Sequence, residues 1–532
     1  MPILSFGHTQ IIVDCDSATP VQNGYLLSGA QPMLRLPAAP ERFYHHGWQS
    51  WSLAAWSTPQ TLPEQKPAIY HPLQIDPLYA HHPAPHGNWL GAVEFADGNI
   101  LFLGSLGLEA HVQLREGRLQ GWVETGPSTG MTWFAACGPE EQIFAAYARL
   151  LQEKLGRGRA AHSYRVWCSW YSLYSAIDEA VLARTFQALG DLPFDVLQVD
   201  DGWQMAIGDW QANKKFPSGM GALADGIKAT GRKAGLWLAP LIALDSSHLF
   251  QQHPDWFLRD EDGHPVQAGF HWGGNLYALD TTHPAALDWL AALMRQVRAW
   301  GFDYVKLDFL YAGALPGVRK EALPRETAYR QGLAVMREAL GPEAYLLACG
   351  APILPSLGLC DALRVGPDVA AFWENKRDAH LLCNPTTPGV KNAIRTTLNR
   401  LWLAPLVHTD PDVAFFRRLN STLTPAQSAL LQDLARICNF KTTSDLPQWW
   451  TEAERQTVRA FLEQQSTVER TGRATFRLDR REVDFSAAVD VPLARKKTLS
   501  LPFILWGSEQ RWILRLMEDS DNARYEQLKQ GL

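Results

Sequence analysis

The sequence predicts a multi-domain protein built around a central (β/α)8 TIM barrel, and three observations predict it. The chain has 532 residues, too many for one ordinary domain. From about residue 161 to 465, apolar runs that end in polar or aromatic residues alternate with helical patterns, as in a barrel of about 250 residues. On both sides the pattern is one of short strands and turns. We therefore expect a β domain at 1–160, the barrel at 161–465 and a small C-terminal β domain at 466–532.

The N-terminal region is predicted to be β structure that ends in a helix. Short runs separated by Gly, Pro and Asn include "NILFLGSLGLEAHVQL" (99–114) and "LQGWVETG" (119–126). The stretch "PEEQIFAAYARLLQEKLGR" (139–157) is amphipathic and has acidic residues in its first turn. It predicts a helix that links the β domain to the barrel.

Eight apolar runs predict the barrel strands. In chain order they are "RVWCSWY", "FDVLQVDD", "KAGLWLAP", "DYVKLDF", "AYLLACG", "ALRVGPD", "LAPLVHTD" and "ICNFKTTSD". The connection before "DYVKLDF" is long and predicts an insertion, whereas the one before "ALRVGPD" is short, contains prolines and leaves little room for a helix. "GMGALA" (219–224) matches a dinucleotide-binding pattern but does not follow a strand, so we expect a loop that opens a helix. Further on, "RATFRL", "REVDFSA" and "RWILRL" predict the C-terminal β domain.

Composition excludes several function classes. The net charge of -6 is spread along the chain, and the basic cluster 495–497 is short, so neither nucleic acid nor a membrane is expected as a partner. The chain has no signal-peptide pattern and no apolar run of transmembrane length. Seven cysteines without a CxxC pair favour buried, reduced thiols in a cytoplasmic protein. We expect no cofactor and no metal, because the adjacent pairs His45–His46 and His81–His82 cannot direct both rings to one ion from a regular strand.

Polar residues gather where the predicted strands end. Lys306 and Asp308 share one face of "YVKLDF", and a barrel strand has no free edge that could solvate that face. A structural Lys306–Asp308 ion pair is an alternative, but it does not explain why other strands have the same feature. The other candidates are Trp170 and Tyr171 on strand one, Gln198, Asp200 and Asp201 on strand two, Trp237 on strand three, Cys349 on strand five, and Arg364, Gly366 and Asp368 on strand six. All should meet at the C-terminal mouth of the barrel, where active sites lie.

These residue types favour glycoside chemistry. Carboxylates combined with a lysine, an arginine and indoles, without a cysteine–histidine ligand set, suit sugar hydrolysis. Hydrolysis with retention needs two carboxylates about 5 Å apart. Because alternate strands share layers in a barrel, Asp308 on strand four and Asp368 on strand six are expected to face each other.

The ordered motif set resembles glycoside hydrolase family 36, the bacterial α-galactosidases. It comprises "HHGWQSWS" (45–52), "WCSWY", "VLQVDDGWQ", "GLWLAP", "YVKLDF" and "ACGAPILPSLGLCDALRVGPDV". The resemblance covers most of the chain and implies an N-terminal β-sandwich, a barrel and a C-terminal β domain. It also implies release of terminal α-D-galactosyl residues from galactosides such as melibiose and raffinose, with retention through a covalent glycosyl-aspartate.

The resemblance further implies residue roles. Asp308 would be the nucleophile, and Asp368 the acid/base, whose pKa must therefore be raised. Trp48 or Trp51 would reach in from the N-terminal domain, although their spacing of three also suits a structural cluster. The substrate contacts would be Asp200 and Asp201 at galactose O4 and O6, Lys306 at O3 or O4, Arg364 and Cys349 beside O2, Gly366 near them, and Trp237, Trp170 and Tyr171 as apolar walls.

Other functions and departures from the family stay open. "HTDPD" (408–412) has His-Thr where an asparagine is expected, and the last strand is unusually polar, so substrate preference is in question. An α-N-acetylgalactosaminidase would need space near Cys349 and Arg364, which "APILP" disfavours. A transglycosylase would use the same residues. A silent sugar-binding protein would be expected to have lost a carboxylate. A homo-oligomer remains open.

Overall fold

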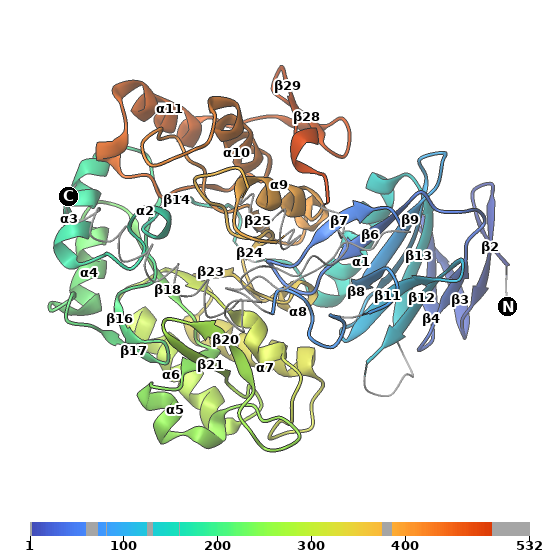
Figure 1. Cartoon of the computed structure of the whole chain (residues 1–532), viewed down its shortest axis with the longest axis horizontal. Helices are drawn as coiled ribbons and strands as arrows, with labels where there is room; N and C mark the ends of the chain where they lie inside the picture. The colour runs from blue at the N-terminus through green and yellow to red at the C-terminus, as the bar shows by residue number, and fades with distance from the viewer. Residues whose placement is uncertain are drawn as a thin grey trace, which may run out of the picture.

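The computed structural model describes residues 3–59, 73–80, 82–124, 131–158, 160–374 and 386–491 (Figure 1). The predicted strand "RWILRL", the basic cluster 495–497 and His81 lie outside these residues.

The N-terminal region consists of two antiparallel sheets. One has the order β1 (Ile3–Phe6), β2 (Thr9–Asp14), β5 (Met33–Arg35), β12 (Arg118–Val123), β11 (Ala110–Arg115), β8 (His86–Asn88). The other has the order β3 (Ser17–Val21), β4 (Gly24–Ser28), β13 (Thr132–Gly138), β10 (Ile100–Ser105), β9 (Leu90–Glu94), β6 (Arg42–His46), β7 (Ala54–Ser57).

The two sheets pack face to face, and glycines let them approach closely. A Cβ on Gly91 of β9 would lie 2.8 Å from a methyl carbon of Val112 on β11. A Cβ on Gly121 of β12 would lie 2.8 Å from the ring of Trp133 on β13. Figure 1 shows the sheets as two layers beside the rest of the chain. The predicted linking helix is α1 (Glu140–Leu155), and Tyr147 on it donates a hydrogen bond of 2.6 Å to the carbonyl of Ser105.

All eight predicted barrel strands are present and form one parallel sheet. Their order is β26 (Lys441–Thr443), β14 (Arg165–Cys168), β15 (Val196–Val199), β18 (Lys233–Leu238), β22 (Tyr304–Leu307), β23 (Tyr345–Ala348), β24 (Ala362–Arg364), β25 (His408–Asp410). The last predicted strand therefore pairs with the first. Beyond β25, the Ala414 N–H donates a hydrogen bond of 2.8 Å to the carbonyl of Thr442 in β26, so the two edges of the sheet approach each other.

Helices fill most of the connections between these strands. They are α2 (Trp170–Leu173), α3 (Glu179–Leu189), α4 (Gly219–Lys228), α5 (His248–Gln252), α6 (Pro284–Ala299), α7 (Arg325–Leu340), α8 (Ile353–Ser356), α9 (Val390–Leu398), α10 (Pro425–Ile437) and α11 (Glu452–Glu463), with short 3-10 turns at Pro254–Trp256, Leu310–Ala314, Leu401–Leu403, Pro447–Trp449 and Ser486–Ala488. The connection containing prolines holds only the single turn α8, as its length predicts. "GMGALA" opens α4, as predicted.

The predicted insertion before β22 is a small antiparallel sheet. It consists of β19 (Ile242–Leu244), β20 (Gln267–His271) and β21 (Gly274–Ala278). A second, two-stranded sheet follows β15 and consists of β16 (Gln204–Ala206) and β17 (Asp209–Ala212). Both additions lie in connections that follow the carboxyl ends of barrel strands, so they are placed to border the mouth.

The C-terminal part that the structure describes is a three-stranded antiparallel sheet docked on the N-terminal region. It consists of β27 (Val468–Arg470), β28 (Thr475–Leu478) and β29 (Arg481–Asp484). The Arg473 guanidinium lies 2.9 Å from a Glu94 carboxylate oxygen and 4.2 Å from the ring centre of Trp56.

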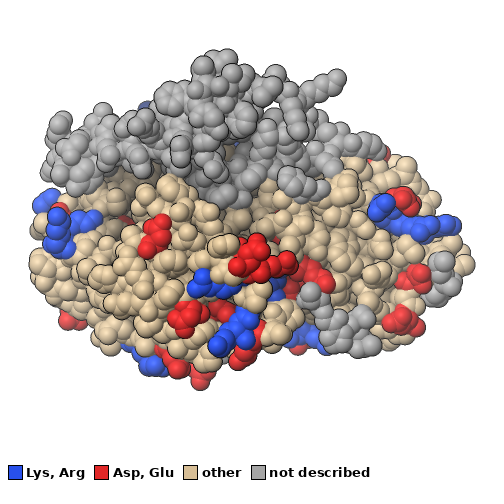
Figure 2. Space-filling view, turned by 60° about the horizontal axis from the view of Figure 1, so that its bottom comes forward, with Lys and Arg blue, Asp and Glu red and all other residues tan. Residues whose placement is uncertain are grey.

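The described residues show a mixed surface charge and unpaired cysteines. In Figure 2, acidic and basic side chains of the described residues lie interspersed on the visible face. No helix among the described residues is long and apolar enough to cross a bilayer. Six cysteines lie in the described ranges, all of them unpaired and four of them buried.

Candidate active site

Lys306 links the ends of β22 and β15, the two strands on either side of β18. Its Nζ lies 3.1 Å from an Asp200 oxygen and 3.8 Å from an Asp308 oxygen. Lys306 and Asp308 are only 5% and 7% exposed, which excludes a solvated strand face. Burial lowers the pKa of Lys306, but Asp200 and Asp308 outweigh burial and hold that pKa well above its usual value. The lysine is therefore a permanent buried cation between two carboxylates.

Asp308 follows β22 directly and is held through both oxygens. Trp237 Nε1 donates to Oδ2 at 2.9 Å, and the Phe309 N–H donates to Oδ1 at 2.8 Å. Phe309 adopts a left-handed backbone with φ of +54°, which is costly for a bulky residue and turns the chain sharply after the aspartate. These contacts fix the orientation of the carboxylate.

Asp200 and Asp201 lie side by side after β15 and have different partners. Gln198 Nε2 donates to Asp200 at 2.7 Å. Gln204 Nε2 and Trp272 Nε1 donate to the two oxygens of Asp201, at 2.5 and 2.7 Å. Burial raises the pKa of Asp201, while these two donors oppose the rise.

Arg364, at the end of β24, holds three carboxylates. Its guanidinium lies 3.0 Å from Asp368, 2.8 Å from Asp410 and 2.8 Å from Asp412. The Tyr171 hydroxyl also donates to Asp412. The Asp368 side chain is 23% exposed, whereas those of Asp410 and Asp412 are 2% and 0% exposed. Asp368 is therefore the most exposed of the three carboxylates.

The surroundings of Asp368 raise its pKa above the ordinary aspartate value. Burial raises its pKa, the Arg364 guanidinium opposes the rise, and the charge of Asp308 adds to it. Burial also raises the pKa of Asp412 to about 7, although the Arg364 guanidinium opposes this rise. The charge of Asp308 therefore affects the protonation of Asp368.

Several predicted wall residues lie around these carboxylates. Trp237 is 2% exposed and Cys349, at the end of β23, is 1% exposed; burial raises the pKa of the Cys349 thiol well above its usual value. Trp170 and Tyr171 were expected at the end of strand one. They instead begin the turn α2, because β14 stops at Cys168 and the Leu173 N–H bonds to the carbonyl of Ser169 at 3.1 Å.

Strand six is also shorter than expected. It ends at Arg364, so Gly366 and Asp368 lie in the loop that follows. A Cβ on Gly366 would lie 2.8 Å from Thr397 Oγ1 and 3.1 Å from the carbonyl of Ala393, both on α9. Glycine therefore permits the close approach of α9 to the loop that carries Asp368.

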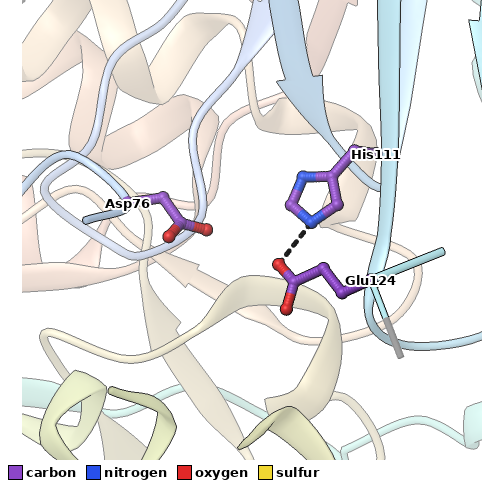
Figure 3. A group of neighbouring side chains, drawn as sticks. All are labelled: Asp76, His111 and Glu124. Carbon is purple, nitrogen blue, oxygen red and sulfur yellow. Dashed lines mark hydrogen bonds and ion pairs between the residues drawn. The ribbon is translucent and has the colours of Figure 1, made fainter. Parts of the chain in front are cut away.

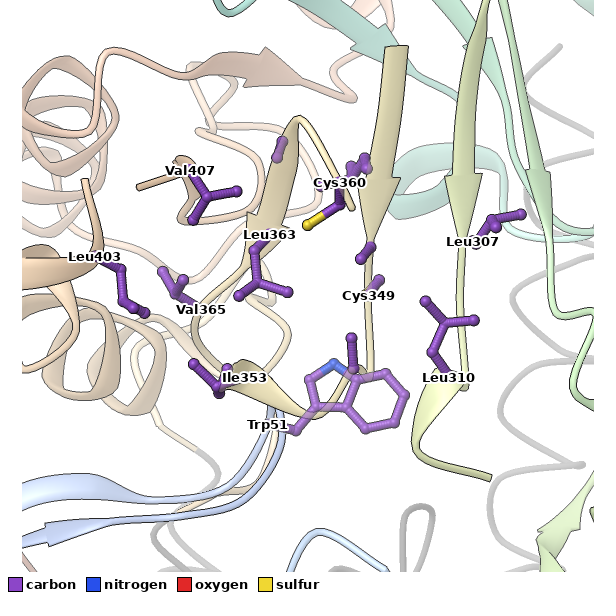
Figure 4. Packing of buried hydrophobic residues seen from close by; sticks show 14 of the residues in the cluster. Trp51, Leu307, Leu310, Cys349, Ile353, Cys360, Leu363, Val365, Leu403 and Val407 are labelled. Atoms are coloured by element: carbon purple, nitrogen blue, oxygen red, sulfur yellow. The ribbon is translucent and has the colours of Figure 1, made fainter. Parts of the chain in front are cut away.

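The two N-terminal indoles lie in different places. The ring of Trp51 lies 5.3 Å from that of Phe309, and Figure 4 shows it beside Cys349 and Leu310. Trp48 instead donates to the carbonyl of Leu73 at 3.2 Å, and the Arg325 guanidinium lies 5.5 Å from its ring centre. Both rings lie near that of Tyr311, at 6.0 Å for Trp51 and 6.2 Å for Trp48, and Trp51 is the indole that packs on Phe309, the residue next to Asp308.

The sequence analysis missed three residues of this site. Trp272 lies on the insertion, and its bond to Asp201 joins positions 71 residues apart, so no local signal marks it. Asp410 and Asp412 lie in "HTDPD", which was noted only as a departure from the family. Polar residues at the end of strand seven, where the other strands also carry site residues, were the available signal.

A possible cation-binding group lies outside this site. Asp76, His111 and Glu124 bring one ligand atom each close together, and Figure 3 shows the hydrogen bond between His111 and Glu124. Arg325 already pairs with both carboxylates, at 2.6 Å in the case of Asp76. A metal ion would have to displace this buried guanidinium, so the donor set does not fit a metal.

Comparisons with known proteins agree on one family. Residues 131–339 match the Melibiase family model. Among curated relatives, α-galactosidase AgaA of Geobacillus stearothermophilus is 28% identical over 208 residues, which cover 36% of this chain and 27% of the relative. The A type blood α-D-galactosamine galactosaminidase of Flavonifractor plautii is 35% identical over 125 residues, 22% of this chain and 12% of the relative. These matches span about a quarter or less of the relatives' lengths.

Solved structures extend the match to nearly the whole chain. TtGalA, an α-galactosidase from Thermus thermophilus solved with p-nitrophenyl α-D-galactopyranoside, is 45% identical, with a TM-score of 0.87 over 92% of this chain and 99% of TtGalA. The structure of AgaA, a GH36 α-galactosidase, is 17% identical with a TM-score of 0.56 over 83% of this chain and 65% of AgaA, and so supports the fold alone. The chain belongs to glycoside hydrolase family 36, the family of the bacterial α-galactosidases.

Proposed function

We propose that this protein is a retaining exo-α-galactosidase that releases terminal α-D-galactosyl residues from small galactosides such as melibiose and raffinose. The observation that carries the proposal is the pair of aspartates in contrasting environments. Asp308 is pinned by two N–H donors, and Asp368 is partly exposed with a raised pKa. TtGalA, which has been solved with p-nitrophenyl α-D-galactopyranoside and with stachyose, supports the substrate class.

In the first step, an Asp308 oxygen attacks the anomeric carbon. The bond from that carbon to the leaving-group oxygen breaks, and Asp368 gives its proton to that oxygen. The product is a galactosyl ester of Asp308 and a free alcohol. Lys306 lies beside Asp308 and can neutralise its charge before attack.

In the second step, Asp368 acts as the base. Burial still raises the pKa of Asp368, but esterified Asp308 carries no charge, so its contribution to that rise is lost and the carboxylate form of Asp368 becomes more accessible. Asp368 takes a proton from water, the water oxygen attacks the anomeric carbon, and the ester bond breaks. Two inversions give net retention.

The remaining site residues are proposed to bind galactose. Asp200 and Asp201 offer charged acceptors for sugar hydroxyls, and Lys306 and Arg364 offer charged donors. Trp237, Trp170, Tyr171 and Trp51 are proposed to provide apolar walls, with Cys349 directly after β23 and Gly366 in the loop after β24.

We also propose that the parallel sheet closes into a (β/α)8 barrel between β25 and β26. The hydrogen bond from Ala414 to Thr442 supports closure. The domain limits 1–160, 161–465 and 466–532 remain proposals, and they agree with the order of the sheets.

The test is an NMR assay of aryl α-galactoside cleavage with Asp308→Gly in parallel. The wild type should release α-galactose first. The variant should lose activity and, with azide, form β-galactosyl azide, because azide fills the space of the missing nucleophile. Asp262→Gly, at an exposed loop aspartate, is the control and should keep full activity.

Three other outcomes would change the proposal. Initial β-galactose would mean inversion and would contradict the two-aspartate mechanism. Cleavage of only the N-acetylgalactosaminide would move the substrate to that sugar. Transfer of galactose to a second sugar at the expense of free galactose would indicate a transglycosylase.

A further inference from the structure

The tip of the β20–β21 hairpin has a residue unsuited to its backbone. His271 pairs with Gly274, so the turn consists of Trp272 and Gly273. Both have positive φ, +51° and +75°, as in a type I′ turn. Such a turn favours Asn-Gly or Gly-Gly, and a large side chain in its first position is strained. A strained residue of this kind suggests a function that the turn itself does not need.

The Trp272 indole reaches from the insertion to a carboxylate of the proposed sugar site. Its Nε1 donates to Asp201 Oδ2 at 2.7 Å, while Gln204 Nε2 donates to Oδ1 at 2.5 Å. Asp201 is 3% exposed, so a loss of either donor would leave a buried carboxylate oxygen without a partner. The two donors together fix the plane of the carboxylate.

The Trp272 ring also contacts both residues that hold Asp308. It lies 5.3 Å from the ring of Phe309 and 6.2 Å from that of Trp237. The Phe309 N–H and the Trp237 indole N–H are the donors to Asp308. The indole itself is only partly buried. It therefore lies over the mouth and touches the supports of two carboxylates at once.

We propose that Trp272 is a positioning residue that fixes Asp201 for a sugar hydroxyl and covers the mouth beside Asp308. The inference rests on the proposed function, because it requires that a galactoside bind at Asp201. It deepens that function by making the insertion, not only the barrel, part of the substrate site. The strained turn persists because no smaller residue at this position reaches Asp201.

The decisive variant is Trp272→Asn, because asparagine is preferred at this turn position. The hairpin should remain intact, because relief of the turn strain opposes the stability lost with the bond to Asp201. Asparagine is too short to bridge to Asp201 as the indole does, so kcat/KM on p-nitrophenyl α-galactoside should fall roughly 10-fold or more, the loss typical of a hydrogen bond to a charged group. If Trp272→Asn keeps the hairpin folded but lowers activity, the lost activity reflects the position of Asp201 and not a folding defect.

Trp272→Phe tests the indole N–H. The ring remains but Asp201 loses a donor to its charged form, so the acid limb of the pH profile of kcat/KM should move to higher pH. Trp256→Phe is the matched control, an indole of the same insertion that stacks on His253 at 3.9 Å. It should leave both kcat/KM and the pH profile unchanged.

Two results would overturn the inference. If both Trp272 variants keep kcat/KM within twofold with an unmoved acid limb, Trp272 is only a turn residue. If Trp256→Phe loses as much activity as Trp272→Phe, the effect belongs to the insertion as a whole. Failure of the proposed function is distinct, because the wild type itself would then not cleave the aryl galactoside.

Discussion

Asp308 and Asp368 are chemically identical side chains that their surroundings make different. Asp308 is 7% exposed and accepts hydrogen bonds on both oxygens. The Asp368 side chain is 23% exposed and pairs with Arg364 at 3.0 Å. A fixed, fully hydrogen-bonded carboxylate suits nucleophilic attack, whereas a partly solvated carboxyl with a raised pKa suits proton transfer.

The proposed acid/base role of Asp368 predicts a dependence on the leaving group. Asp368→Asn would remove the proposed proton donor, so cleavage of raffinose should fall far more than formation of the galactosyl ester from p-nitrophenyl galactoside, whose leaving group needs little protonation. General acid catalysis contributes about 10²–10⁴-fold, and a loss of that size is expected with raffinose. Steady-state and pre-steady-state kinetics on both substrates would measure it.

Azide provides the control for this variant. As an anion it needs no general base, so it should restore turnover of the galactosyl ester and give α-galactosyl azide. Equal losses on both substrates with no effect of azide would contradict an acid/base role for Asp368.

At the scale of elements, the loop after β24 depends on the approach of α9. Gly366→Ala would place a methyl group 2.8 Å from Thr397 Oγ1 and 3.1 Å from the carbonyl of Ala393. We expect overpacking to cost about 1–3 kcal/mol of stability and to lower kcat by moving Asp368, two residues further on. Thermal unfolding and kcat of the same preparation would measure both effects.

Gly226→Ala on α4 is the matched control. An added Cβ there meets nothing within 4 Å, and alanine favours a helix over glycine by about 0.5–1 kcal/mol. Its Tm should rise slightly at unchanged kcat. If Gly366→Ala behaves in the same way, the close approach of α9 does not constrain the loop.

The elements differ in how far the sequence predicts them. Most of the barrel strands are predictable because they are buried apolar runs separated by helical patterns, and the single turn α8 is predictable because its connection is short and contains prolines. The lengths of the strands are less predictable: β14 and β24 stop before Tyr171 and Asp368, where side-chain contacts replace the ladder. Local patterns carry no information on such contacts.

The residues of the candidate site also differ in how far the sequence predicts them. Lys306, Asp308 and Asp200 are predictable, because a polar residue at the end of an apolar strand is locally conspicuous. The bond between Trp272 and Asp201 is not, because it depends on how an insertion folds back over the mouth. The spacing of Trp48 and Trp51 suits both a structural cluster and a wall of the substrate site. Packing against Phe309 distinguishes the two indoles.

At the scale of the whole molecule, buried charges join the N-terminal sheets to the barrel. Arg325, on α7 of the barrel, pairs with Asp76 and Glu124 of the N-terminal region. Beside it, Glu109 accepts the N–H groups of Glu326 at 2.7 Å and Thr327 at 3.0 Å. In return, Glu326 accepts the Glu109 N–H at 2.6 Å and Trp89 Nε1 at 2.9 Å. These reciprocal bonds fix α7, which follows the Asp308 loop, against the N-terminal sheets.

This carboxyl pair predicts that stability falls as pH rises. Burial raises the pKa of Glu109 to about 7 and that of Glu326 well above its usual value; Arg325 opposes both shifts. The folded state therefore holds protons that the unfolded state releases near pH 4.5, the ordinary glutamate value. Between pH 4.5 and pH 7 the folded state binds more protons than the unfolded state. The free energy of unfolding should therefore decline as pH rises, by on the order of 1–3 kcal/mol.

Glu326→Gln isolates this effect, because a neutral amide keeps an acceptor for Trp89 and the Glu109 N–H and cannot ionise. The Tm of the wild type should fall between pH 5 and pH 8 more steeply than that of Glu326→Gln, so the two curves should diverge as pH rises. Arg325, Glu124, Arg319 and Asp76 face the pair and are unchanged in the variant. Glu338→Gln, at an exposed position of α7, should follow the wild type. If the Tm of Glu326→Gln and that of the wild type fall equally between pH 5 and pH 8, the Glu109–Glu326 pair does not cause the dependence of stability on pH.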